Sequence, residues 1–261
     1  MSRGRALALM VMIASLITPL ITPLPTHADP LPSGTGFLSE DLQARQADEA
    51  ANPGMLWVDE GARLWQSPQG ATGASCASCH GDATTSMRGI ATRYPAVDAT
   101  SGALLNLEDR INLCRTRHQK AEPYPYESDP LLGLTAYVAR QSLGLPMDVE
   151  TGGAAAPFYA AGEAFFHRRQ GQLNLSCAQC HDDNAGRSLR GDTISHGLGN
   201  GYPAYRLEWQ SLGSLQRRLR SCSFGVRAVQ FDYGSPDYLA LELYLAKRAQ
   251  GVAIETPAIR R

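Results

Sequence analysis

Cys177-Ala178-Gln179-Cys180-His181 decides how this sequence is interpreted, together with an earlier copy, Cys76-Ala77-Ser78-Cys79-His80. The pattern C-x-x-C-H is the attachment signature of c-type haem. Its two cysteines form thioethers to one porphyrin, and its histidine supplies the proximal nitrogen to the iron. A single copy could equally belong to a disulfide or to half of a zinc site. Two copies in one chain favour two c-type haems over both alternatives.

The stretch from Met1 to Ala28 is typical of a cleaved secretory signal peptide. Arg3 and Arg5 form a basic start, Ala6 to Leu20 is apolar, and Thr26-His27-Ala28 offers a small-residue cleavage site. The apolar run is short and interrupted by polar residues and proline, so it does not favour a membrane span. Because haem of this type is attached outside the cytoplasm, we predict a periplasmic protein.

Charge and length narrow the classes of protein that remain. The chain has 24 basic and 25 acidic residues and a formal net charge of −1. This balance gives no basis for nucleic-acid binding or for a polybasic membrane anchor. The part of the chain that follows Ala28 is long enough for two small domains.

The haem motifs belong to a longer internal duplication. The alignment that superposes Cys76 on Cys177 also aligns the residues before each motif. The aligned pairs are Trp57 and Phe158, Val58 and Tyr159, Gly61 and Gly162, Leu64 and Phe165, Trp65 and Phe166, and Asp82 and Asp183. In each copy the apolar positions recur with helical spacing. Since glycine inside a helix costs about 1 kcal/mol relative to alanine, Gly61 and Gly162 are expected where another helix crosses closely.

Each half also contains a second apolar helical pattern, over 131–138 and 238–245. Asp129-Pro130 and Ser235-Pro236 are typical helix starts. A glycine-bearing helix before the motif that crosses a later helix resembles the cytochrome c fold. We therefore predict an all-α protein with two tandem cytochrome c domains. The expected organisation is a signal peptide at 1–28, an N-terminal arm at 29–52, domain 1 at 53–147, a linker at 148–156 and domain 2 at 157–261.

The second axial ligand of each iron is less obvious from the sequence. Methionine or histidine is usual in electron carriers, but no methionine follows Met147. Downstream of His181 the strong ligands are His196 and Cys222. When Tyr94-Pro95 is aligned with Tyr202-Pro203, Cys222 coincides with Cys114, whereas His196 has no histidine counterpart. The duplication therefore favours the axial pairs His80/Cys114 and His181/Cys222.

Three other interpretations of these ligands stay open at the level of sequence. Cys114 and Cys222 could form a disulfide between the domains, as exported proteins often do. Each could instead be an inert buried thiol. Met87, which is close to the first motif, could be the ligand of the first haem.

Arginines accompany Cys222. If this segment is helical, Arg218 lies one turn before Cys222 on the same face. Cations lower the pKa of a neighbouring thiol, and the guanidinium fork suits oxyanions. Arg218 could therefore contact an anionic substrate, or it could neutralise a haem propionate, as Arg110 would in the first repeat. Weaker candidates, or packing residues, are Arg217, Arg220, Lys247, His196, Tyr202 and Trp209.

The leader, the two motifs and a cysteine after each motif with arginines before it together resemble the SoxA family, the dihaem subunit of the SoxAX cytochrome of thiosulfate oxidation. The resemblance covers nearly the whole chain after the leader. It implies His/Cys ligation at both irons. It also implies that Cys222 is the catalytic sulfur and can carry a persulfide, and that Arg218 contacts substrate.

The implied reaction joins thiosulfate to a cysteine of a SoxYZ-type carrier protein and releases two electrons. The implied partner is a SoxX-type monohaem subunit in a heterodimer, which would pass electrons to a soluble cytochrome c. Two alternatives remain: a thiosulfate dehydrogenase that forms tetrathionate, and a non-catalytic dihaem electron carrier.

Overall fold

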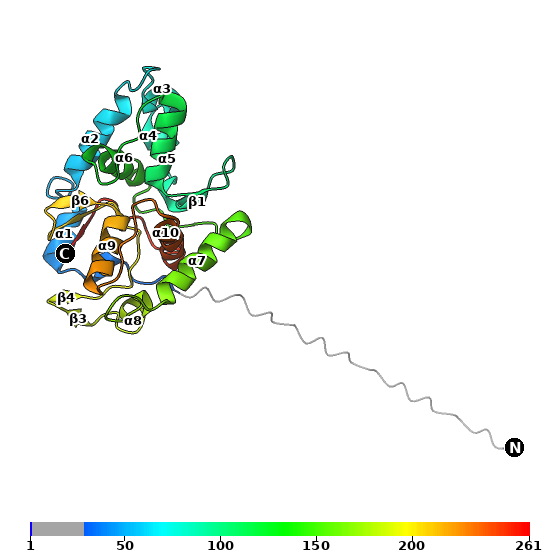
Figure 1. The fold of residues 1–261 in the computed structure, drawn as a ribbon, viewed down its shortest axis with the longest axis vertical. Coiled ribbons are helices and arrows are strands. Elements are labelled where there is room, and N and C mark those ends of the chain that lie inside the picture. The colour runs from blue at the N-terminus through cyan, green and yellow to red at the C-terminus, as the bar shows by residue number, and fades with distance from the viewer. Residues whose placement is uncertain (2–28) are drawn as a thin grey trace.

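Two crossed helix pairs repeat each other in the two halves of the chain (Figure 1). In the first half α2 (Met55–Gln66) packs on α6 (Asp129–Arg140). In the second half α7 (Ala156–His167) packs on α10 (Pro236–Arg248). The structure is a computed structural model that describes Met1 and residues 29–261, so the predicted signal peptide lies outside the described residues. None of the described helices is long and apolar enough to cross a membrane.

The predicted glycines lie at both crossings. A Cβ atom on Gly61 would be 2.1 Å from the carbonyl oxygen of Gly133, and one on Gly162 would be 2.0 Å from that of Ala240. Any side chain at these positions would therefore push the helix axes apart. The predicted reason for both glycines, a close helix crossing, is confirmed.

Short helices carry the haem motifs and the cysteines that follow them. α3 (Cys76–His80) and α8 (Cys177–His181) hold the motifs, while α5 (Leu107–Cys114) and α9 (Leu215–Gly225) hold the second cysteines. Each motif helix begins after a serine whose hydroxyl accepts a backbone N–H, and α8 has a complete capping box. The start of each motif helix is thus fixed by the serine that precedes its first cysteine.

The remaining elements are short. Helix α1 spans Glu40–Ala47, α4 Ala83–Ser86, and a π-helix Arg115–Gln119, with 3₁₀ turns at Gly34–Phe37, Ala91–Arg93 and Gly153–Ala155. β1 (Ala96–Val97) pairs with β2 (Leu104–Leu105), and β3 (Ser188–Leu189) with β4 (Asp192–Thr193). In a third sheet β5 (Ala204–Arg206) lies between antiparallel β6 (Ser211–Gly213) and parallel β7 (Ala258–Arg260).

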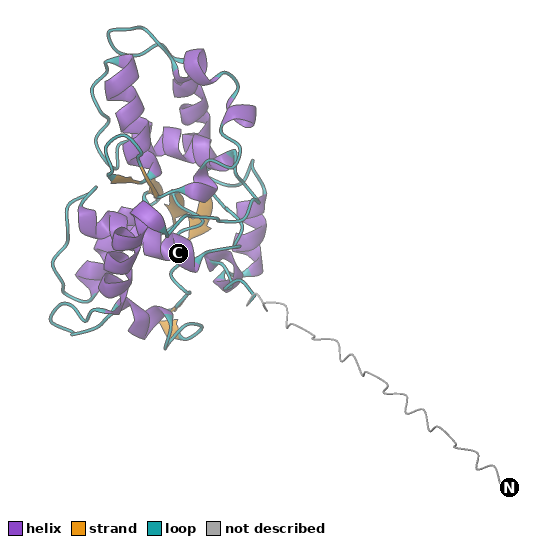
Figure 2. Cartoon of the chain, turned by 90° about the vertical axis from the view of Figure 1, so that its right-hand side faces the viewer, coloured by secondary structure: helices purple, strands orange, loops and turns teal. Residues whose placement is uncertain are grey.

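Helices dominate the architecture, and the strands are confined to these short segments (Figure 2). The predicted all-α class with tandem cytochrome c domains is confirmed, although no strand was predicted from the sequence. Strands of two or three residues are too short to produce a recognisable alternation of apolar and polar positions.

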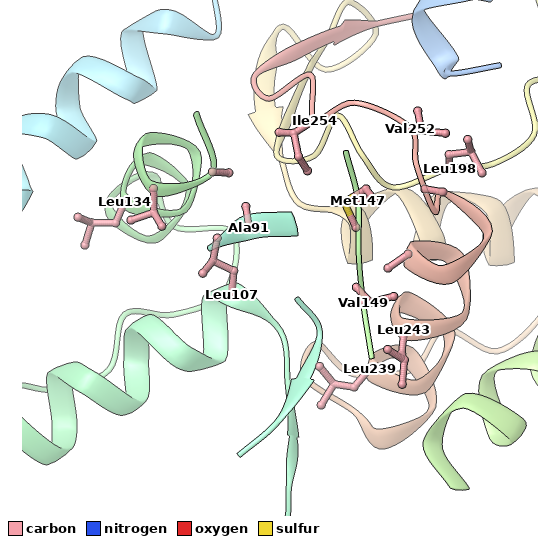
Figure 3. Packing of buried hydrophobic residues seen from close by; sticks show 14 of the residues in the cluster. Ala91, Leu107, Leu134, Met147, Val149, Leu198, Leu239, Leu243, Val252 and Ile254 are labelled. Atoms are coloured by element: carbon pink, nitrogen blue, oxygen red, sulfur yellow. The ribbon is translucent and has the colours of Figure 1, made fainter. Parts of the chain in front are cut away.

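One hydrophobic core extends across both halves. It contains Leu64 and Trp65 from the first half and Leu239 and Leu243 from the second. Figure 3 shows Met147 and Val149 on one extended segment, with Val149 beside the α10 residues Leu239 and Leu243. The halves therefore pack as one body.

The N-terminal arm packs against the C-terminus. The hydroxyl of Thr35 donates to a carboxylate oxygen of Glu255 over 2.7 Å. The side-chain oxygen of Gln46, on α1, accepts from the backbone N–H of Ile259 in β7 over 2.8 Å. These contacts fasten α1 to the third sheet.

Two buried carboxyl groups lie where the halves meet. Glu108 on α5 and Glu242 on α10 line a cavity of about 80 Å³ with Asn106 and Thr135. Burial, reinforced by the neighbouring carboxylates of Asp109 and others, raises the pKa of Glu108 from its usual 4.5 to about 7. The pKa of Glu242 is also raised by burial and by Glu108.

This arrangement predicts a stability that falls as the pH rises. The folded state holds the Glu108 proton more tightly than the unfolded state, so the stabilisation is complete below pH 4.5 and is lost as the pH rises towards about 7. The contribution is up to about 3 kcal/mol, at 1.36 kcal/mol per pKa unit. Urea unfolding at pH 5 and pH 8 should give a smaller difference for Glu108→Gln than for the wild type. An equal difference in both proteins would contradict the prediction.

Candidate functional site

In the second repeat Cys222 and His181 face each other. Cys222 lies on α9, and His181 ends α8. Burial of the Cys222 sulfur raises its pKa, but the Arg218 guanidinium, His181 and Arg206 lower it more strongly, so the pKa falls from 9.0 to about 7. The structure thus brings together the sulfur, the imidazole and the cation that the sequence predicted as one site.

The imidazole of His181 is held in a defined orientation. Its Nδ1 lies 2.7 Å from the carbonyl oxygen of Ser195. Because a carbonyl only accepts, Nδ1 carries the proton, and Nε2 is the unprotonated nitrogen that can ligate a metal. Gly197, with a φ of +70°, lies against the ring, and a Cβ there would be 2.9 Å from it. Ser195 and Gly197 were not predicted as site residues, since no motif marks either of them.

A second cation near Cys222 was also not predicted as a site residue. Arg206 lies on β5, is 5% exposed and lowers the pKa of Cys222. Its guanidinium stacks on the ring of Trp209 at 5.0 Å. Arg206 is far from Cys222 in the sequence and lies on a different element, so helical periodicity does not relate the two residues.

The other arginines of this region have separate contacts. Arg217 stacks on Trp209 at 4.2 Å, and Arg220 stacks on Tyr233 at 4.8 Å. No ion pair to Arg218 is found among the described residues. The Arg218 charge is therefore available to the sulfur and to an anion beside it.

The first repeat has a similar frame but different electrostatics. Cys114 ends α5 and lies near the motif cysteines Cys76 and Cys79. Burial raises its pKa, and the nearby arginines only partly oppose the rise. One of them, Arg110, forms an ion pair with Asp98 over 3.1 Å. Arg110 therefore differs from its counterpart in the second repeat, for which no carboxylate partner is found in the described part of the chain.

Backbone hydrogen bonds fix the spacing between each motif and its second cysteine. In the second repeat Gln172 and Leu173 donate to the carbonyl oxygens of Arg227 and Val226. In the first repeat Ala71 and Thr72 donate to those of Lys120 and Gln119. The loop before each motif is thereby tied to the segment after the distal cysteine.

The alternatives left open by the sequence involve cysteines and methionines. All six cysteines lie within residues 29–261 and are free there, and Cys114 and Cys222 lie beside different motifs, so the interdomain disulfide is absent from the structure. Met87 packs against the hydrophobic core that the two halves share, and Met147 lies inside that core with 4% of its surface exposed.

The other candidates have contacts of their own. The ring of His196 lies 5.8 Å from that of Phe37, and the Lys247 ammonium donates to Gln250. Tyr202 lies close enough to Arg218 to affect its pKa.

Each repeat thus offers two motif thiols, one imidazole and a further sulfur. This donor set fits a c-type haem, and the fold and the paired sites define a tandem c-type cytochrome. A family model described as "SoxA/TsdA, cytochrome c domain" matches residues 60–147 and 161–254. The chain belongs to this SoxA/TsdA family, as the sequence predicted.

Two of the relatives that the chain matches carry the same name. The chain is 39% identical to the L-cysteine S-thiosulfotransferase subunit SoxA of Pseudaminobacter salicylatoxidans, over 88% of this chain and 80% of the relative. It is 36% identical to that of Rhodovulum sulfidophilum, over 91% and 84%. A crystal structure of SoxXA from P. pantotrophus matches with a TM-score of 0.85 and 37% identity, covering 88% of this chain and 87% of that one.

Proposed function

We propose that this protein is a periplasmic dihaem L-cysteine S-thiosulfotransferase, which joins thiosulfate to a cysteine of a SoxY-type carrier. The observation that carries the proposal is the group of Cys222, His181 and Arg218, in which a sulfur of lowered pKa lies beside a cation that forms no ion pair with a described carboxylate. The names of the relatives support the same reaction.

The residues suited to hold the two haems follow from the paired sites. Cys76 and Cys79 would hold one haem through thioethers, and Cys177 and Cys180 the other; His80 with Cys114, and His181 with Cys222, would be the residues that ligate the two irons. Bound there, haem would supply one-electron redox chemistry, which a thiolate ligand would tune to low potential. The protein's own contribution is to orient His181 through Ser195 and to hold the Cys222 sulfur beside Arg218.

The reaction forms one sulfur–sulfur bond. The terminal sulfur of thiosulfate bonds to the sulfur of the carrier cysteine, and the thiol loses its proton. The product is a protein S-thiosulfonate, and two electrons leave for a soluble cytochrome c acceptor. Cys222 acts as the nucleophile and transient sulfur acceptor. Its thiolate bonds to the terminal sulfur of thiosulfate as the two electrons are removed, and the carrier thiolate then attacks that same sulfur, which breaks its bond to Cys222 and restores the Cys222 thiolate. A persulfide of Cys222 would act in the same way with one more sulfur, and Arg218 holds the sulfonate oxygens through charge-assisted hydrogen bonds.

Electron removal requires a partner. The matched crystal structure is that of SoxXA, and this supports a heterodimer of the present chain with a SoxX-type monohaem subunit. Such a subunit would receive the electrons and pass them to the soluble cytochrome c.

Product analysis separates the proposal from its rivals. The purified protein, with its monohaem partner, is incubated with thiosulfate and ferric cytochrome c, with and without a SoxYZ-type carrier. A carrier-dependent thiosulfonate on the carrier cysteine supports conjugation. Tetrathionate formed without a carrier would instead identify a thiosulfate dehydrogenase, and no thiosulfate-dependent reduction would identify an electron carrier.

Replacing Arg218 by alanine is expected to lower kcat/KM for thiosulfate about 10- to 100-fold. The reason is the loss of a charge-assisted hydrogen bond, about 1.5–3 kcal/mol. Arg110→Ala is the matched control, because Arg110 occupies the equivalent position in the first repeat and pairs with Asp98. Steady-state kinetics should show little change for that control. Equal losses in both variants would indicate a shared role at haem propionates.

A further inference from the structure

A loop of the first half reaches the helix that carries Cys222. One carboxylate oxygen of Glu127 accepts the backbone N–H of Ser214, the residue that caps α9, over 3.3 Å. The other lies 3.8 Å from Nη1 of Arg217. The Ser214 hydroxyl in turn accepts the N–H of Arg217 over 3.1 Å. Glu127 therefore contacts both residues that define the start of α9.

The adjacent tyrosine strengthens this junction. The rings of Tyr126 and Tyr233 are stacked with centroids 5.7 Å apart and an interplanar angle of 12°. The Tyr126 hydroxyl donates to Asp109 on α5 over 2.8 Å. Gln216 on α9 accepts the N–H of Gly234 over 2.7 Å. The loop with Tyr126 is thus held on α5, and the loop with Tyr233, on which Tyr126 stacks, is held on α9.

The internal duplication makes Glu127 informative. The alignment that relates Tyr137 to Tyr244 also relates Tyr126 to Tyr233, and it pairs Glu127 with Gly234. Both paired residues have left-handed backbone, with φ of +62° at Glu127 and +71° at Gly234. Glycine is the ordinary residue for this conformation, which costs a residue with a side chain about 1 kcal/mol or more. In the first repeat Glu127 adopts this unfavourable conformation, and its carboxylate reaches α9.

The two helices that carry the second cysteines, α5 and α9, are consequently held differently. Gly234 has no side chain with which to reach α5, whereas Glu127 contacts the cap of α9. A carboxylate at a helix N-terminus is also stabilised by the helix dipole. From that end α9 runs through Arg218 to Cys222.

We propose that Glu127 is a positioning residue through which the first cytochrome domain sets the placement of α9, and so of Cys222 and Arg218 relative to His181. The proposal rests on the proposed function, because Cys222 must be the ligand and catalytic sulfur of the second site. It gives the first domain a role in the reaction that does not depend on electron transfer through its own haem.

The test compares three variants of the holoprotein bound to its monohaem partner. Glu127→Gly installs the residue of the other repeat, which removes both contacts while easing the backbone. Glu127→Gln keeps an acceptor oxygen for Ser214. Glu60→Gln removes a carboxylate from an ion pair at the surface of α2 and is the matched control. Each is examined by electron paramagnetic resonance of the ferric protein, thermal unfolding and thiosulfate kinetics.

For Glu127→Gly we expect a Tm within about 3 °C of the wild type, since the backbone gain offsets the lost contacts. The signal of the second haem should shift or split while that of the first is unchanged, and kcat/KM should fall about tenfold, the equivalent of about 1.4 kcal/mol. Glu127→Gln should show less than half of this fall in kcat/KM on a logarithmic scale, and Glu60→Gln should match the wild type.

An unchanged second-haem signal with kcat/KM within twofold of wild type would overturn the proposal, as would equal changes at both haems. If Glu127→Gly does not mature with both haems, Arg217→Gln removes the same ion pair from α9, and its second-haem signal decides in the same way. The spectra also separate this proposal from the proposed function. A wild-type protein that forms no thiosulfonate would refute the reaction, while the comparison of second-haem signals would still decide whether Glu127 positions α9.

Discussion

Replacing Cys222 by alanine is expected to lower the rate of thiosulfate conjugation about 1000-fold or more, while both haems remain covalently attached. The substitution removes the sulfur that faces His181 and leaves Arg218 without its anionic neighbour. Loss of a nucleophile is among the largest effects that a single side chain has on catalysis. The rate is measured as thiosulfate-dependent reduction of cytochrome c in the presence of the carrier.

The controls use the neighbouring helix residue and the equivalent cysteine. Ser223→Ala changes a side chain of similar size on the same helix and should retain nearly full activity. Cys114→Ala removes the sulfur of the first site, where the pKa is raised instead of lowered, and should lose far less activity than Cys222→Ala. Equal losses in the two cysteine variants would contradict the assignment of the chemistry to the second repeat.

Mass spectrometry without reductant tests the state of the same sulfur. The Cys222 peptide of protein isolated from the periplasm is expected to carry one extra sulfur in a fraction of molecules, whereas the Cys114 peptide should not. A disulfide between these two peptides would disagree with the structure, in which all six cysteines are free.

The duplication explains why much of the fold and part of the site could be predicted. Each pattern occurs once in each half of the chain. The predicted helix crossing at Gly61 was therefore supported by the equivalent Gly162, and the predicted ligand Cys114 by the equivalent Cys222. Both glycines lie at helix crossings, as expected. Arg218 and Cys222 share one helix, so their proximity followed from helical periodicity.

The site residues that the sequence did not predict are brought to the site by the tertiary fold, and no local sequence pattern marks them. Arg206 arrives on a strand of three residues, and Ser195 contributes only a backbone carbonyl. The shared core and the contact of Glu127 with α9 join segments far apart in sequence. The sequence pairs Glu127 with Gly234, but it shows neither that both have left-handed backbone nor that the Glu127 carboxylate reaches α9.

Replacing Gly162 by alanine is expected to destabilise the protein by about 3–5 kcal/mol or to prevent maturation, because overpacking of a core typically costs about 1–3 kcal/mol and a clash with backbone is at the upper end or beyond it. The new Cβ would lie 2.0 Å from the carbonyl oxygen of Ala240 and 2.9 Å from Cβ of Tyr244. Both belong to α10, so neither a rotamer change nor a small side-chain shift relieves the clash. Alanine's better helix propensity returns about 1 kcal/mol of this at most.

A graded series of glycine variants distinguishes the clash from other causes. Gly61→Ala should resemble Gly162→Ala, since its Cβ would be 2.1 Å from the Gly133 carbonyl oxygen. Gly133→Ala should cost less, with its nearest atom at 2.9 Å, and Gly225→Ala on α9 meets nothing within 4 Å and should be close to neutral. Denaturant unfolding of the holoprotein measures each change in the free energy of unfolding. If Gly162→Ala were as stable as Gly225→Ala, α7 and α10 could not cross as closely as the structure has them, and the geometry that orders the second repeat around His181 would have to be redrawn.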